Sequence, residues 1–203
     1  MPRSTTYSPS DLLTAAGTLV AEGGPSKATV GAISEVSGAP VGSIYHRFPS
    51  REVLLAHLWL RTVEGFQRGF LKVLGDGPPH PAGLNAALYT PRWVRRNLTD
   101  ARILLLHRRS DFLTPDAPSE LRKRAEALAQ QVADGIGSYA AAALGNSGKA
   151  EVRRATFAVI DIPYAAVRSY VVAARRPPAF VDELIADAYR GVMRIGAAPD
   201  GGV

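Results

Sequence analysis

The order of apolar and polar residues in the first fifty positions predicts three short helices. The first begins with Ser8, which suits the N-cap position, and Pro9, which suits the first turn. Its apolar residues repeat at helical spacing on one face: Leu12, Ala16, Leu19 and Val20. The stretch EGGPS at residues 22–26 then ends this helix.

The next two helices are shorter and are separated by a tight turn. One starts at Thr29 and stops at Gly38. Its short apolar face comprises Val30, Ile33 and either Val36 or Ser37. The other lies within the stretch GAPVGSIYHRFPS, residues 38–50, which has Pro and Gly before it and Pro after it. The apolar face of this helix comprises Val41 in part, Ile44, Tyr45 and Phe48.

Longer helices are predicted for the rest of the chain. Ser50 suits the N-cap of a fourth helix that runs to about Val73. Further helical periodicity covers about residues 84–97, 100–110, 119–144, 149–173 and 179–196. We interpret the Pro- and Gly-rich stretch at 75–83 as a loop within one larger domain, because apolar periodicity resumes after it. Strand signals are not found, so the predicted fold class is all-α.

The composition is that of an ordinary globular protein. Hydrophobic residues make up 46% of the chain and charged residues 21%, so it can bury a core. The absence of Cys excludes disulfides and thiolate sites. We find no signal-peptide pattern and no apolar stretch that approaches the roughly 20 residues needed to span a bilayer. The expected setting is therefore the cytoplasm, with no membrane partner.

The net charge of +6 is not concentrated around residues 38–50. Residues 1–51 carry four basic and three acidic residues, whereas residues 52–130 carry twelve and eight. Part of this excess lies in the clusters RWVRRN and HRR, at 92–97 and 107–109. These clusters are either solvated faces or a means of attracting an acidic effector or the DNA backbone. Net charge alone indicates a nucleic-acid partner only weakly, so the local pattern must decide.

That local pattern is typical of a helix-turn-helix. Two short helices joined by a turn that contains Gly place the second helix in the DNA major groove. The recognition helix would be about residues 41–47, with an outward face of Gly42, Ser43, His46 and Arg47 and with Tyr45 at its boundary. Small residues at its start would let the backbone approach base edges. The competing interpretation is an ordinary solvated face.

The stretch TVGAISEVSGAPVGSIYHRFPSREVLL, residues 29–55, resembles the DNA-binding signature of TetR-family one-component transcriptional regulators. The resemblance implies that Thr29 caps the second helix and touches the DNA backbone. It places Val41 and Ser43 at base-reading positions, and it gives phosphate or backbone contacts to Tyr45, His46, Arg47 and Arg51. Two positions depart from the family pattern: Gly31 replaces a frequent Arg, and Pro40 replaces a capping Ser. Because few side chains are left to read bases, either the DNA specificity is modest or the arm at residues 2–7 contributes to it.

The resemblance also implies a C-terminal domain that binds an effector and dimerises through its last two long helices. It divides the chain into a helix-turn-helix domain at 1–50 and a helical domain at 51–203. The candidate dimer contacts form an apolar stripe of Val181, Leu184, Ile185, Ala188 and Val192, for which packing within one chain is the alternative. The candidate effector contacts are Trp59, Phe66, Trp93, His107, Asp161 and Tyr164. Each aromatic residue could instead be core, and Asp161 could instead cap the helix that restarts near Pro163.

Enzymatic motifs are not found. The four His residues show no metal-ligand spacing, and there is no nucleophile elbow, Walker loop or dinucleotide fingerprint. We therefore expect no catalytic residues, no metal and no cofactor. The predicted function is a homodimeric, ligand-responsive transcriptional repressor that binds a palindromic operator in double-stranded DNA. The alternatives are an all-helical enzyme that binds small molecules and a structural DNA-binding protein without an effector.

Overall fold

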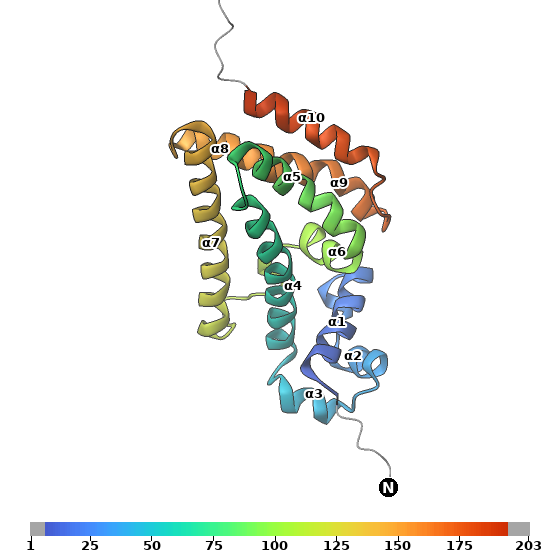
Figure 1. Cartoon of the computed structure of the whole chain (residues 1–203). Helices are drawn as coiled ribbons and strands as arrows, with labels where there is room; N and C mark the ends of the chain where they lie inside the picture. Colours follow the sequence, from blue (N-terminus) through green and yellow to red (C-terminus); the bar gives the residue numbers. More distant parts are fainter. Residues whose placement is uncertain (1–6, 195–203) are drawn as a thin grey trace, which may run out of the picture. The chain divides into compact units, whose positions relative to one another are not determined.

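The computed structural model describes residues 7–194, and every regular element in that range is helical (Figure 1). The prediction of an all-α fold is confirmed. The helices are α1 (Pro9–Gly23), α2 (Val30–Ser37), α3 (Val41–Arg47), α4 (Arg51–Leu74), α5 (Pro79–Arg96), α6 (Leu98–Leu106), α7 (Ser119–Leu144), α8 (Lys149–Thr156), α9 (Ile162–Val172) and α10 (Phe180–Arg194). Short 3-10 turns lie at Pro25–Lys27 and Arg109–Asp111, and one π-helical turn at Phe157–Asp161 joins α8 to α9.

The described chain forms two compact units. The first runs from Tyr7 to Glu64 and includes Thr99–Ala127, so it continues well past residue 50. The second comprises Gly65–Leu98 and the described residues from Leu128 onward. Both α4 and α7 therefore contribute their N-terminal parts to the first unit and their C-terminal parts to the second.

The first unit is built around the apolar face of α1. The side chain of Ser8 accepts a hydrogen bond from the backbone N–H of Asp11, and the Asp11 carboxylate accepts one from the backbone N–H of Ser8. This capping box fixes the start of α1. The hydrogen bonds from Ser8 lower the pKa of Asp11. The buried core comprises residues from α1 to α4 and from α6, among them Leu12, Ala16, Val20, Ile33, Ile44, Leu54, Leu58 and Ile103.

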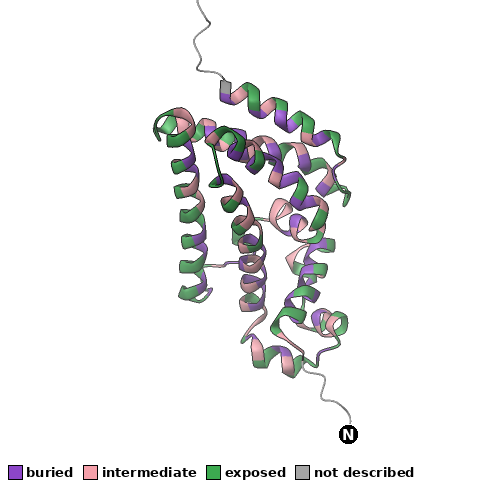
Figure 2. Ribbon diagram, viewed as in Figure 1, coloured by how far each residue is buried: buried purple, intermediate pink, exposed green. Residues whose placement is uncertain are grey.

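The second unit has its own core, which excludes water from the inner faces of α5, α7, α8, α9 and α10. Its buried members include Phe70, Ala87, Ile136, Val159, Val181 and Ile185. Figure 2 shows buried positions alternating with exposed ones along these helices, as expected for amphipathic helices. The second unit therefore buries one stripe of each helix and leaves the opposite stripe exposed.

One segment of the second unit is apolar enough to cross a membrane by length and composition. It is the continuous helical run Lys149–Val172. Core helices of soluble proteins pass the same test, and here Ala155, Val159, Val167 and Val171 are buried against the rest of the unit. The sequence had been expected to contain no apolar stretch that approaches this length.

Candidate nucleic-acid interface

The turn between α2 and α3 is fixed by local hydrogen bonds. The Thr29 side chain accepts a hydrogen bond from the backbone N–H of Ala32 at 3.1 Å, which confirms Thr29 as the N-cap of α2. At the other end, Gly38 has φ +71°, a left-handed conformation that costs Gly little. The Ser34 hydroxyl then donates to the carbonyl of Ala39 at 2.6 Å. These bonds give a rigid turn before the next helix.

The helix α3 is held by two buried side chains and starts without a side-chain cap. Ile44 and Phe48 are both buried in the first core. Pro40 occupies the N-cap position, where its carbonyl accepts a hydrogen bond from the backbone N–H of Ser43 at 2.8 Å. Because the inward face is anchored in this way, the remaining residues of α3 must face outward.

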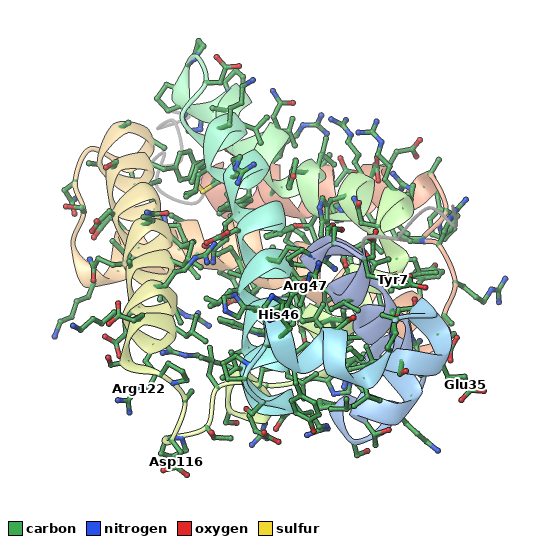
Figure 3. All side chains as sticks on the ribbon, turned by 90° about the horizontal axis from the view of Figure 1, so that it is seen from below. Tyr7, Glu35, His46, Arg47, Asp116 and Arg122 are labelled. Atoms are coloured by element: carbon green, nitrogen blue, oxygen red, sulfur yellow. The ribbon has the colours of Figure 1, made fainter. Side chains whose placement is uncertain are left out.

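The outward face of α3 is exposed. Tyr45 is 51% exposed, and Val41, Gly42 and His46 are exposed as well. Figure 3 shows His46 and Arg47 side by side on α3. A Cβ atom built on Gly42 would meet no neighbouring atom within 4 Å, and the same holds for Gly31 on α2. The face therefore offers room for a closely approaching partner.

Arg47 and Ser43 lie at the edge of this face and are half-buried. A terminal nitrogen of Arg47 lies 3.4 Å from the carbonyl oxygen of Ser43, one turn earlier in α3. This long contact leaves the other donors of the guanidinium available. The predicted recognition-helix residues thus share one surface.

Arg51 differs from its predicted role as a DNA-backbone contact. Its Nε donates a hydrogen bond to the carbonyl of Ala28 at 2.9 Å, and one terminal nitrogen donates to the carbonyl of Pro25. The other terminal nitrogen lies 3.4 Å from the Glu52 carboxylate. The guanidinium therefore holds the turn at Pro25–Lys27 against the start of α4. Because these hydrogen-bond donors of Arg51 point toward the chain itself, we expect Arg51 to support the fold rather than to contact DNA.

Two residues near α2 were missed or placed wrongly by sequence reasoning. Val36 was one of two alternatives for the apolar face, with Ser37, and it is 51% exposed. Ile33 is the one buried residue of α2. The helical spacing could not show whether Val36 or Ser37 shares its face. Tyr7, the last residue of the predicted arm, packs against the first core, and its hydroxyl lies near Gly38. Residues 2–6 of that arm lie outside the described residues.

Comparison with protein-family models gives a match to the bacterial regulatory proteins of the tetR family over residues 12–58. Residues 12–58 thus carry the N-terminal domain of TetR-family regulators. The matched range covers α1, α2, α3 and the first turns of α4, and so contains the interface described above. The resemblance found in residues 29–55 is confirmed, and the matched domain supports a DNA-binding regulator.

Solved structures with a similar fold are also transcriptional regulators. FadR from Bacillus subtilis, in complex with stearoyl-CoA, has a TM-score of 0.69 at 15% identity, with 92% of this chain and 98% of that chain covered. The fatty acid degradation regulator FadR from Bacillus halodurans has a TM-score of 0.67 at 14% identity, with coverage of 95% and 100%. A regulator from Rhodococcus sp. Rha1 has a TM-score of 0.66 at 18% identity, with the same coverage. No curated protein sequence matches the chain.

The six predicted effector-contact residues divide between the two units. Phe66 and Trp93 meet edge to face in the second unit, with ring centroids 5.1 Å apart. Trp59 and His107 instead belong to the first unit, where Trp59 packs against the first core. The other two predicted contacts, Asp161 and Tyr164, do not lie beside Phe66 and Trp93 in the sequence.

Asp161 and Tyr164 lie at the junction of α8 and α9. A carboxylate oxygen of Asp161 lies 2.8 Å from a terminal nitrogen of Arg153, so this charge is paired within the helical run. Tyr164 is exposed. The predicted capping role of Asp161 is also not found, because its side chain makes no cap hydrogen bond.

Two cavities of the second unit have the size of small-molecule pockets, about 300–1,000 Å³. The α4–α7 cavity, of about 510 Å³, is lined by residues from the end of α4, the following loop and α7, including Leu71, Leu74, Asp134, Ser138 and Tyr139. The α5–α10 cavity, of about 630 Å³, is lined by residues including His80, Leu84, Tyr189, Arg190 and Met193. None of the six predicted effector contacts lines either cavity.

The predicted dimer contacts of this regulator divide into two groups. Val181 and Ile185 are buried in the second core of the same chain, so they have no surface for another subunit. Ala188 and Val192 are half-buried. Leu184, by contrast, is 60% exposed and remains available. Part of the apolar stripe on α10 therefore packs within the chain, as the alternative interpretation held, and part of it faces outward.

Proposed function

We propose that this TetR-family regulator is a ligand-responsive repressor that binds a palindromic operator as a homodimer and leaves it when a small molecule binds. The exposed face of α3, held outward by the buried Ile44 and Phe48, is the observation that carries the proposal. The two cavities of the second unit support an effector, and the FadR relative in complex with stearoyl-CoA is consistent with one. The proposed setting is the cytoplasm, without a membrane partner.

The DNA contacts are assigned by position on the exposed face. Val41, Gly42 and Ser43 open α3 and reach base edges, where Gly42 permits close approach. Tyr45, His46 and Arg47 extend further and donate hydrogen bonds to phosphates, as does the Thr29 hydroxyl at the start of α2. Arg51 supports the interface from inside and does not touch DNA.

The dimer is assigned to exposed apolar residues of the second unit. Those on the helical run from α8 to α10 are Phe157, Tyr164, Val172, Phe180 and Leu184. Water-exposed apolar residues gathered on the terminal helices are typical of a surface that another chain covers. A two-fold dimer requires the operator half-sites to follow the same symmetry.

The deciding experiment is selection of bound DNA from a random pool, followed by addition of small molecules to the isolated complex. The proposal expects one palindromic consensus and a compound that raises the Kd for it. A protein that binds DNA without a consensus, or whose consensus complex no compound dissociates, would be a structural DNA-binding protein. The Tyr45→Ala variant, which keeps Ile44 and Phe48, serves as the control that should lose selection but stay folded.

A further inference from the structure

Two apolar side chains of α3 are exposed on the face that carries the proposed DNA contacts. Val41 is 43% exposed and Tyr45 is 51% exposed. Side chains four positions apart in a helix lie on the same face, so these two form one surface, the Val41–Tyr45 patch. The patch continues directly into His46 and Arg47, which lie side by side in Figure 3. A partner that binds those two residues therefore also covers the Val41–Tyr45 patch.

The chain holds Val41 in a fixed outward position. Ala39 before it and Ile44 after it are each 1% exposed and belong to the first core. Between them, the Pro40 carbonyl accepts hydrogen bonds from the backbone N–H groups of Ser43 at 2.8 Å and Ile44 at 3.3 Å. A β-branched side chain in a helix also has one strongly preferred rotamer. Val41 therefore loses little conformational freedom when a partner contacts it.

The start of α3 has no long polar side chain that could read a base. Residues 29–45 contain no Arg, Lys, Asn or Gln, the residue types that form bidentate hydrogen bonds with guanine or adenine. Glu35 is the one charged residue in this range, and Figure 3 shows it well apart from His46 and Arg47. Ser43 is half-buried. Base readout at the start of α3 must therefore use apolar contact.

The DNA major groove offers one apolar group for such a contact, the C5-methyl group of thymine. Other base edges present donors and acceptors, and a Val side chain that covers them leaves them without hydrogen bonds, which is unfavourable. Next to Val41, a Cβ atom built on Gly42 would meet no other atom of the chain within 4 Å. The backbone at this point can therefore come close enough to DNA for Val41 to touch a methyl group.

We infer that Val41 reads the C5-methyl group of a pyrimidine in each operator half-site, with the ring of Tyr45 packed beside the same methyl group. This inference rests on the proposed DNA-binding function and names the base feature that the recognition helix selects. In unmodified DNA the methyl group belongs to thymine. The same group at the same position is also carried by 5-methylcytosine, so the test includes both bases.

The test uses the full chain and the operator selected from a random pool. Each thymine of a half-site is replaced in turn by uracil, which differs only by the missing methyl group, and the Kd is measured by fluorescence anisotropy. We expect one position at which uracil raises the Kd about three- to four-fold, the effect of burying one methyl group. A consensus without thymine in its half-sites, or one in which every thymine tolerates uracil, would overturn the inference.

A matched pair of valine variants shows which residue reads the methyl group. Val41→Ala should weaken binding to the thymine operator and should no longer distinguish thymine from uracil at the sensitive position. Val36→Ala, which changes a valine on α2 that is 51% exposed, should keep the wild-type difference. Circular dichroism should show both variants folded, because neither side chain is part of the core. A Val41→Ala variant that keeps the full uracil effect would show that another residue reads the methyl group, and the inference would be wrong.

A third variant separates the ring of Tyr45 from its hydroxyl group. Tyr45→Phe removes the proposed phosphate contact but keeps the apolar ring. It should therefore weaken binding to the thymine and uracil operators by the same factor and leave their ratio unchanged. A ratio that falls to one in Tyr45→Phe would assign the discrimination to the hydroxyl group and would contradict an apolar readout.

The last comparison identifies the base that carries the methyl group. Cytosine and 5-methylcytosine, each paired with guanine, are placed in turn at the sensitive position. A Kd about three- to four-fold lower for 5-methylcytosine would show that the methyl group is read on either pyrimidine, whereas equal Kd values would restrict the readout to thymine. Absence of any consensus would contradict the proposed repressor itself. A consensus that tolerates uracil throughout would instead overturn only the methyl readout.

Discussion

Replacing Arg51 tests whether a cation beside the recognition helix supports the fold or the DNA. Arg51→Ala leaves the carbonyls of Ala28 and Pro25 without the donor that joins them to α4. A hydrogen bond from a charged donor contributes about 1.5–3 kcal/mol, and the lower end applies here because the side chain is partly exposed. Two such bonds amount to roughly 2–3 kcal/mol, which corresponds to a fall in Tm of roughly 5–10 °C for a chain of this length.

The DNA-binding readout should separate Arg51 from Arg47. Each phosphate contact contributes about 0.9 to the slope of log K against log salt concentration. Arg47→Ala should therefore lower the slope by about one with little change in Tm, because its contact with Ser43 is long. Arg51→Ala should lower Tm and keep the slope. Arg51→Lys should lie between the wild type and Arg51→Ala in stability, because an ammonium cannot bridge the two carbonyls in the same geometry.

Circular dichroism gives the Tm of each variant, and fluorescence anisotropy on the selected operator gives the slope at several salt concentrations. Measurements are made at a temperature where every variant is folded. An Arg51→Ala variant with unchanged Tm and a slope reduced by one would refute the structural role and restore the DNA contact that the sequence predicted.

Three further predictions concern other parts of the chain. Ala174 follows α9 in a left-handed conformation with φ +51°, next to a hydrogen bond from the Arg175 N–H to the Tyr170 carbonyl. Because Gly adopts this conformation at little cost, Ala174→Gly should raise the free energy of unfolding in urea by about 0.5–1 kcal/mol. A destabilised variant would contradict this prediction. Leu184→Glu should give monomers by light scattering, while Ile185→Glu should unfold the chain; a Leu184→Glu dimer would move the interface elsewhere. Burial and the charge of Arg124 lower the pKa of His57, so folding stability should fall as pH drops below about 6.5. His57→Gln should reduce this dependence, and an unchanged pH profile would exclude His57.

The helix-turn-helix could be predicted because its determinants are local. The cap at Thr29 and the left-handed Gly38 act within one turn of their own positions, and the anchors Ile44 and Phe48 repeat at helical spacing. The role of Arg51 could not be predicted in this way. Its partners are backbone carbonyls 23 and 26 residues earlier, and a carbonyl leaves no mark in the amino-acid sequence.

The second unit was predicted less well because its contacts join distant segments. The hydroxyls of Tyr139 and Tyr189 lie 2.7 Å apart although the two residues are 50 positions apart in the sequence, and neither residue belongs to a motif. On α10 the apolar stripe was visible, but periodicity alone could not tell which residues face the chain's own core. Val181 and Ile185 face it, whereas Leu184 does not, and this distinction depends on where α5 and α9 pack.

The two open glycines of the interface make the regulator adaptable as a scaffold. A Cβ atom added at Gly31 or Gly42 meets no other atom of the chain within 4 Å. A glycine inside a helix also costs about 1 kcal/mol relative to alanine, so replacing either residue should strengthen the helix. New side chains at these two positions would therefore be selected by the DNA alone. We therefore expect substitutions at Gly31 to change the operator preference without loss of folding stability, whereas a side chain at Gly42 would remove the space for close approach to DNA.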